Sequence, residues 1–231
     1  IDCELFARIA SLFSFLSGAP TKTGFHPYTQ EGLYRGNFLN APVPYSPYLH
    51  ISKQFLNLAY ALETKTIPNA KHAPPAESLK VPQKKYTTAE IGKFTNKLFK
   101  EFSKISERPL VLVYPSGGAL SVRAWPIEYY SRFCKSLIDD QLSVGIIGLD
   151  SDWPLGQQIT NFTDSVYCFN LTGYTRTKSD LLLLLQWASL LVTNDGGPGH
   201  LSAIVDTPAI IFFGPETPHL YRPLSSNVYC F

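Results

Sequence analysis

A glycine-rich turn between a short apolar strand and a helix constrains this chain more than any other feature. Residues 190–192 predict the strand, and the turn that follows reads Asn194-Asp195-Gly196-Gly197. Pro198 marks the start of the helix, because a proline at the first helical position loses no hydrogen bond there. Glycines allow close approach of a ligand to the backbone, and a helix N-terminus attracts negative charge. The turn therefore predicts an anion site, which we interpret as the site of a diphosphate-linked sugar.

Asp195 is the carboxylate of this turn, and two roles are open to it. In the functional role it accepts hydrogen bonds from the hydroxyls of a nucleotide-linked sugar. In the structural role it caps the following helix by accepting a backbone N–H near Gly197. The sequence alone leaves both roles open.

Residues 87–231 alternate between strands and helices. Strands are predicted at residues 110–114, 143–147, 166–169, 190–192, 209–213 and 227–231. Helices are predicted after the Thr87-x-x-Glu90 capping box, from Pro126, after the loop 148–152 and, with Ser179 as its cap, over residues 180–188. Short apolar strands that alternate with helices indicate an α/β fold, a parallel sheet covered by helices on both faces. Ligands of such sheets bind at the carboxyl ends of the strands.

The first third of the chain is less regular. Helices are predicted over residues 5–16 and 50–62, and a strand over residues 21–25. Four prolines argue against regular structure over residues 26–49. Residues 64–86 have the proline and lysine content of a linker. We therefore expect residues 1–63 and residues 87–231 to belong to different domains.

Composition narrows the classes of function. The net charge of +2 gives no reason to expect a nucleic-acid partner. The four cysteines show no C-x-x-C pairing, which favours a reducing compartment. The sequence shows no signal peptide and no apolar stretch of the roughly 18 residues that a membrane span needs. It also contains no methionine, so we expect it to be an internal piece of a longer protein.

Several motifs together resemble glycosyltransferase family nine, the heptosyltransferases. That family has the pattern N-D-[ST]-G-P-x-H-x-A-A followed by a strand that ends in F-G-P. The present chain has Asn194-Asp195-Gly196-Gly197-Pro198-Gly199-His200-Leu201-Ser202-Ala203 and then Phe213-Gly214-Pro215. Tyr114-Pro115-Ser116-Gly117-Gly118 and Arg123-Ala124-Trp125-Pro126 resemble the family's H-P-G loop and K-x-W-P motif. Weaker similarities to the N-terminal half of the family lie at residues 2–5, 23–25, 31–36 and 50–52.

The resemblance implies a GT-B architecture of two Rossmann-like domains. On this interpretation residues 87–231 form a complete or nearly complete C-terminal domain that binds a nucleotide-sugar. Residues 1–63 would be the remainder of an acceptor-side domain. The general base of the reaction would lie upstream of residue 1.

The resemblance also implies a chemistry and a set of residues. The reaction would be an inverting, metal-independent sugar transfer without a cofactor, in which backbone N–H groups and a basic side chain stabilise the leaving diphosphate. Arg123 would take the place of the family's lysine and Asp195 would orient the sugar, so both are assigned to catalysis. The residues assigned to donor binding are Ser116, Gly117, Gly118, Asp152, Gly196, Gly197 and His200.

The implied partners are an ADP-heptose-like donor and a lipid-linked, lipopolysaccharide-type glycan acceptor. The implied location is the cytoplasm, with contact at the cytoplasmic face of the inner membrane through the lysine-rich residues 64–108. The alternative interpretation is that this segment is a solvated hinge and an exposed helix face without a partner.

Each site residue also has a simpler interpretation. His200 could be satisfied by backbone groups at its helix, and Arg123 beside Trp125 could be a surface pair. The loop Asp150-Ser151-Asp152 matches the D-x-D motif of metal-dependent glycosyltransferases, although two solvated carboxylates explain it better. The chain also departs from the family pattern, since Gly196 replaces a hydroxyl residue and Gly199 a frequent methionine.

Three classes of function therefore remain. The first is a glycosyltransferase with heptose as the leading candidate sugar. The second is a nucleotide-sugar-binding module that has lost its chemistry. The third is another enzyme of similar fold, such as a sugar-nucleotide epimerase; the lack of a G-x-G-x-x-G motif after a strand argues against a dehydrogenase.

Overall fold

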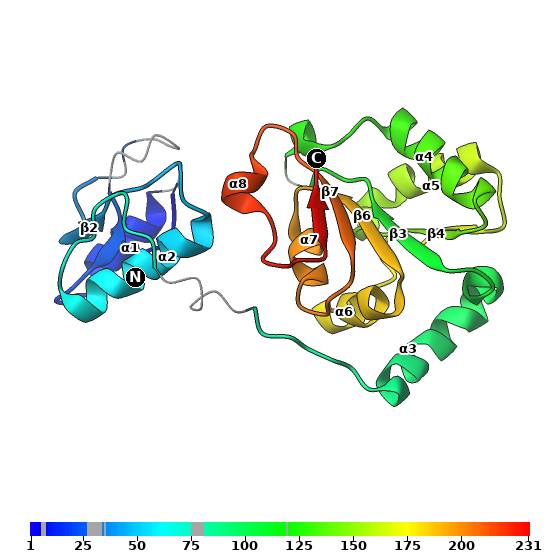
Figure 1. Cartoon of the computed structure of the whole chain (residues 1–231), viewed down its shortest axis with the longest axis horizontal. Helices are drawn as coiled ribbons and strands as arrows, with labels where there is room; N and C mark the ends of the chain where they lie inside the picture. Colours follow the sequence, from blue (N-terminus) through cyan, green and yellow to red (C-terminus); the bar gives the residue numbers. More distant parts are fainter. Residues whose placement is uncertain (6–7, 27–33, 35, 75–80, 119) are drawn as a thin grey trace. The chain divides into compact units, whose positions relative to one another are not determined.

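The computed structural model describes residues 1–5, 8–26, 34, 36–74, 81–118 and 120–231. The chain forms two compact units (Figure 1). The first comprises residues 1–80 and 219–221, and the second comprises residues 81–218 and 222–231.

The second unit is built on a parallel six-stranded sheet with the strand order β5-β4-β3-β6-β7-β8. Its strands are β3 (Leu110–Tyr114), β4 (Ser143–Ile146), β5 (Cys168–Asn170), β6 (Leu190–Asn194), β7 (Ala209–Phe212) and β8 (Val228–Cys230). Its α-helices are α3 (Thr88–Glu101), α4 (Ile127–Asp139), α5 (Trp153–Thr163), α6 (Lys178–Trp187) and α7 (Gly197–Ser202). The short α8 (Pro218–Tyr221) belongs to the first unit except for its first residue. Short 3₁₀ turns η2, η3 and η4 lie at Ser103–Ser106, Ser121–Arg123 and Asp150–Asp152. The predicted α/β class with a parallel sheet is confirmed.

The strand order places a topological switch point in the middle of the sheet. The chain runs outward from β3 to β4 and β5, then returns to the other side of β3 for β6. Tyr114 at the end of β3 pairs with Thr193 near the end of β6. Because the crossovers on the two sides leave in opposite directions, a crevice opens at the carboxyl ends of these two strands. The glycine turn of residues 195–197 begins there.

Alternate residues of the central strands pack against helices on opposite faces of the sheet. Leu112 and Leu191 face the cluster that contains Leu98 of α3 and the leucines of α6. Val113 and Val192 face the cluster formed with α4 and α5 (Figure 1). Both layers of side chains exclude water from β3 and β6. The two strands that end at the crevice are therefore held in a close-packed core.

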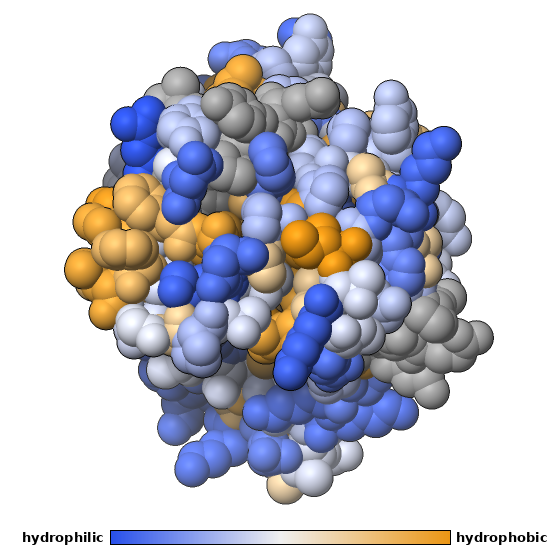
Figure 2. Space-filling view, turned by 90° about the vertical axis from the view of Figure 1, so that its left-hand side faces the viewer, coloured by the Kyte–Doolittle hydropathy of each residue, from blue (hydrophilic) through white to orange (hydrophobic). Residues whose placement is uncertain are grey.

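The first unit contains β1 (Thr23–Phe25), β2 (Ala41–Val43), α1 (Ile9–Leu16) and α2 (Ile51–Thr64). Phe25 and Val43, from the parallel pair β1 and β2, pack with Leu58 of α2. On α1 the polar Ser11 is buried and bonded to Asp2, whereas the apolar Phe13 is 68% exposed. Figure 2 views the molecule from the left-hand side of Figure 1 and shows apolar side chains gathered on that surface.

Two local predictions were wrong. Pro42 lies within β2 although its ring argued against regular structure; a proline is tolerated there because β2 lies at the edge of its sheet. The cap of α6 is Thr177 and not Ser179, since the Thr177 hydroxyl accepts the N–H of Asp180 in a capping box. The Thr87–Glu90 capping box at the start of α3 is confirmed.

No helix in the part of the chain that the structure describes is long and apolar enough to span a membrane.

Candidate functional site

The glycine turn lies in the crevice at the switch point, as its place in the sequence predicted. Gly196 is the N-cap residue of α7, with φ and ψ of 174° and −177°. A Cβ at Gly197 would meet no heavy atom within 4 Å, and one at Gly196 would meet its nearest neighbours at 3.8 and 3.9 Å. The backbone of this turn therefore faces open space that a ligand could fill.

The opposite wall of the crevice is the loop after β3. Ser116 is buried, and its hydroxyl accepts the N–H of Gly118, whose φ is +61°. A side chain at Gly117 would collide with the carbonyl of Leu120 at 2.6 Å. These glycines thus shape a tight loop, and Gly117 has a packing role in addition to the predicted one.

Asn194 joins the two walls, a role the sequence interpretation missed. It is completely buried, and its Oδ1 accepts the backbone N–H of Trp125 at 3.0 Å and the hydroxyl of Tyr130 at 2.9 Å. Its Nδ2 donates to the carbonyls of Pro115 and Ser116 at 3.0 and 3.2 Å. Burial raises the pKa of Tyr130, so its hydroxyl keeps the proton that it donates. Asn194 therefore fixes the β3 loop against β6.

Arg123 lies between two carboxylates, one of which is Asp195 of the glycine turn. One guanidinium nitrogen lies 3.7 Å from Asp195 Oδ2, and the other lies 3.7 Å from Glu216 Oε1. Both distances exceed hydrogen-bond length, and the buried Nε has no hydrogen-bond partner among the described residues. The guanidinium is thus held by charge while several of its N–H groups remain able to bind an anion.

Aromatic packing holds the segment that carries Arg123. Trp125 stacks on Tyr129 with ring centroids 5.4 Å apart and contacts Phe212 of β7 at 4.9 Å. Together with the hydrogen bond from Trp125 to Asn194, this packing limits the positions that Arg123 can reach.

Asp195 does not cap α7 in the structure. The N-cap is Gly196, without a side-chain hydrogen bond, and the Asp195 backbone N–H donates to Phe212 at 2.9 Å. The carboxylate, 8% exposed, lies beside Arg123 instead. The helix-cap interpretation of Asp195 therefore does not match the geometry.

Next to the turn lies a cavity of about 270 Å³ with mostly apolar walls. Gly197, Pro198 and Leu201 form one side. The rest comes from the ends of β3 and β4, the segment before α6 and α6 itself, through Tyr114, Ile147, Gly148, Leu149, Thr175 and Leu181. Leu149, in the loop after β4, is 71% exposed, and the sequence interpretation did not assign it to the site. A flat heterocycle would fit such walls.

The remaining predicted residues lie at the margins. Asp152 Oδ2 accepts the backbone N–H of Leu149 at 2.8 Å, so it stabilises the loop that borders the apolar cavity without itself lining that cavity. His200 is exposed in the last turn of α7. Asp150, the other carboxylate of the D-x-D motif, pairs with Arg176 at 3.0 Å.

Comparison with known proteins places this geometry in a family. The profile of glycosyltransferase family 9 (heptosyltransferase) matches residues 8–231. Lipopolysaccharide heptosyltransferase 2 of Escherichia coli is 26% identical over 219 residues, which cover 94% of this chain and 60% of that protein. The enzyme of the same name from Salmonella typhimurium is 32% identical over 128 residues, 54% of this chain and 36% of that protein. The chain thus spans about a third to three-fifths of these relatives.

Solved structures agree on the fold. The structure of E. coli ADP-heptose LPS heptosyltransferase II matches with a TM-score of 0.70 and 24% identity, over 97% of this chain and 65% of that one. An E. coli heptosyltransferase solved with ADP matches with a TM-score of 0.58 and 16% identity, over 97% of this chain and 63% of that one. Since the family profile extends over nearly the whole sequence, the chain belongs to glycosyltransferase family 9.

Proposed function

We propose that the crevice between β3 and β6 binds a nucleotide-sugar donor and that the protein transfers its sugar to a lipopolysaccharide-type glycan. One observation carries the proposal: Arg123 and Asp195 meet beside an open glycine turn, next to an apolar cavity of about 270 Å³. The names of the relatives make ADP-heptose the leading donor.

The proposed donor lies across the crevice in three parts. The nucleobase occupies the apolar cavity beside Leu149 and Leu201. The diphosphate lies against Gly196 and Gly197 with Arg123 as its counter-charge, and the loop of residues 116–118 closes the other side. The sugar then extends toward Asp195, with Asp152 and His200 at the edges of the site.

The chemistry follows from this placement. An acceptor hydroxyl oxygen bonds to the anomeric carbon while the bond from that carbon to the diphosphate oxygen breaks. The hydroxyl proton passes to a general base, and the leaving diphosphate takes the electron pair. Arg123 is placed to stabilise the negative charge that grows on the leaving group, and Asp195 to orient the sugar hydroxyls.

The domain assignment follows the same proposal. Residues 87–231 form the donor-binding domain, residues 64–86 the linker and residues 1–63 part of the acceptor side. A lipid-linked acceptor would bring the protein to the cytoplasmic face of the inner membrane. Lys93, Lys97, Lys100 and Lys104, which are exposed on and just after α3, are candidates for contact with anionic lipid.

The first prediction concerns the ligand. ADP should raise the melting temperature in proportion to RT ln(1 + [L]/Kd), and EDTA should leave the shift unchanged because no metal takes part. Adenosine, which lacks the phosphates, should give a much smaller shift at the same concentration. A shift that requires manganese would move the site to Asp150 and Asp152 and contradict the proposal, as would the absence of any shift.

The second prediction uses the departure from the family pattern at Gly196. Its extended backbone suits any residue and a Cβ has room, so Gly196→Ser should fold normally. The new hydroxyl could bond to the diphosphate and should raise ADP affinity about fivefold, the equivalent of roughly 1 kcal/mol. Calorimetric titration with ADP measures the change.

Gly117→Ser is the matched control for this variant. It adds the same side chain to the opposite wall, where its Cβ would lie 2.6 Å from a carbonyl, so it should lower the melting temperature. A Gly196→Ser protein that is folded but binds ADP no better would show that the turn does not face the phosphates.

A further inference from the structure

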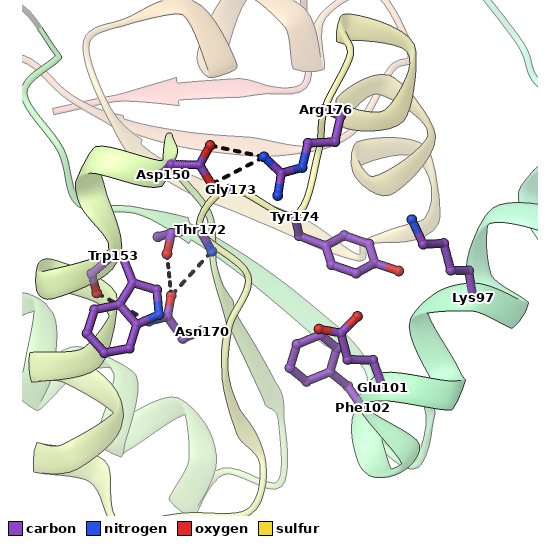
Figure 3. Close-up of a pocket in the computed structure, with 10 residues that line it drawn as sticks. All are labelled: Lys97, Glu101, Phe102, Asp150, Trp153, Asn170, Thr172, Gly173, Tyr174 and Arg176. Atoms are coloured by element: carbon purple, nitrogen blue, oxygen red, sulfur yellow. Dashed lines mark hydrogen bonds and ion pairs between the residues drawn. The ribbon is translucent and has the colours of Figure 1, made fainter.

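A second cavity, of about 290 Å³, lies around the carboxyl end of β5 (Figure 3). Its walls come from α3, from the start of α5 and from the segment after β5. It shares no lining residue with the apolar cavity beside Gly197. The proposed donor site therefore leaves this second cavity unexplained.

Aromatic side chains form part of its wall. Trp153, at the start of α5, is 54% exposed, and its carbonyl accepts a hydrogen bond from Asn170 Nδ2 at 3.2 Å. Across the cavity, Tyr174 packs edge-on against Phe94 and Phe102 with ring centroids about 6 Å apart. An exposed indole and a fixed phenol thus lie on two sides of the cavity, with the segment that carries Thr172 and Gly173 between them (Figure 3).

The hydroxyl of Tyr174 is a second unusual feature. It is buried and has no hydrogen-bond partner among the described residues. Burial raises the pKa of Tyr174, and the negative charge of Glu101 adds to the rise. Lys97 Nζ lies 5.6 Å from the centre of the Tyr174 ring, so the same ring also borders a cation of the cavity wall.

Two cationic and two anionic side chains line the cavity. Lys97 and Glu101 come from α3, and Asp150 and Arg176 form an exposed ion pair at 3.0 Å. A phosphate bound to the cations would also meet the two carboxylates, and an apolar ligand would remove four charges from water. A neutral polyhydroxyl group suits both signs, because each hydroxyl donates to a carboxylate or accepts from a cation.

We propose that this cavity binds a neutral sugar ring of a glycan, with Trp153 against its apolar face and Glu101, Lys97 and Arg176 at its hydroxyls. This site is separate from the donor site and does not depend on the proposed transfer reaction. It would give the protein a second point of contact with a carbohydrate chain.

The test uses the whole chain labelled with ¹⁵N at its three tryptophans, Trp125, Trp153 and Trp187. Methyl glycosides of glucose, galactose and mannose are titrated to about 100 mM, enough to detect a millimolar Kd. At least one should shift the indole N–H signal of Trp153 in a saturable way and leave that of Trp125, beside the donor site, in place. Saturating ADP should not change the titration.

Two variants complete the test. Trp153→Ala should weaken glycoside binding about tenfold, as measured by saturation-transfer NMR, without lowering the melting temperature of the protein. Phe162→Ala removes a similarly exposed aromatic residue of the same helix, 49% exposed, and should bind normally. The proposal is overturned if no glycoside shifts the Trp153 signal, if binding survives Trp153→Ala, or if ADP competes. Failure of the ADP shift alone would contradict only the donor site.

Discussion

Asn194→Ala should lower the free energy of unfolding of the second unit by about 3 kcal/mol, which corresponds to a fall in melting temperature of roughly 6–12 °C. The asparagine is completely buried and makes hydrogen bonds with four groups of two other segments. Alanine leaves those groups buried without partners, and such groups cost more than the hydrogen bonds themselves contribute. Urea unfolding monitored by circular dichroism measures the change.

The control for this variant is Asn161→Ala on α5. Asn161 is exposed and bonds to the side chain of Gln157, so its loss should change stability by less than about 0.5 kcal/mol. Equal stability of the two variants would mean that Asn194 does not join the two walls. Near-native stability together with lost ADP binding would instead place Asn194 in direct contact with the ligand.

Asp195→Asn, made in the full-length enzyme that also carries the general base, should reduce sugar transfer tenfold or more while the protein keeps its melting temperature within about 2 °C and its affinity for ADP. The unchanged melting temperature is expected because the carboxylate lies beside Arg123 and does not cap α7. The loss corresponds to one hydrogen bond to a charged group in the transition state, roughly 1.5–3 kcal/mol. ADP lacks the sugar and so loses no contact with Asp195, and Arg123, with one carboxylate fewer beside it, should bind the diphosphate at least as well.

Glu216→Gln is the matched control, since Glu216 lies at the same 3.7 Å from Arg123. Turnover should fall less than threefold in this variant. Equal losses in the two variants would show that Asp195 acts by holding Arg123 and not by contact with the sugar. Transfer from the intact nucleotide-sugar and ADP titration should be measured on the same preparations.

Sequence reasoning succeeded where a segment's own chemistry decides its structure. β3 was predicted at its exact bounds because Leu110–Tyr114 is an apolar run that both faces of the sheet bury. The capping box of α3 is equally local, since Thr87 and Glu90 satisfy each other's groups within one turn. The glycine turn could be placed because a parallel sheet puts all carboxyl ends at one edge.

It failed where contacts between distant segments decide. The apolar cavity is assembled from five segments, so the exposed Leu149 had no visible partner in the sequence. Helical spacing on α1 could not show that Ser11, bonded to Asp2, would be the buried residue. Asn194 was read as part of a motif, but its role depends on carbonyls of a loop 79 residues earlier in the chain.

The 79 residues between Asn194 and the loop it binds also affect when the protein can first bind a ligand during folding. Neither wall of the crevice exists before β3 and β6 are side by side, and closing a loop of this length is among the slow events of folding. Ligand binding during refolding should therefore appear with completion of the sheet and not with the earlier formation of helices. The time at which fluorescent ADP begins to bind refolding protein would then report when the two central strands pair.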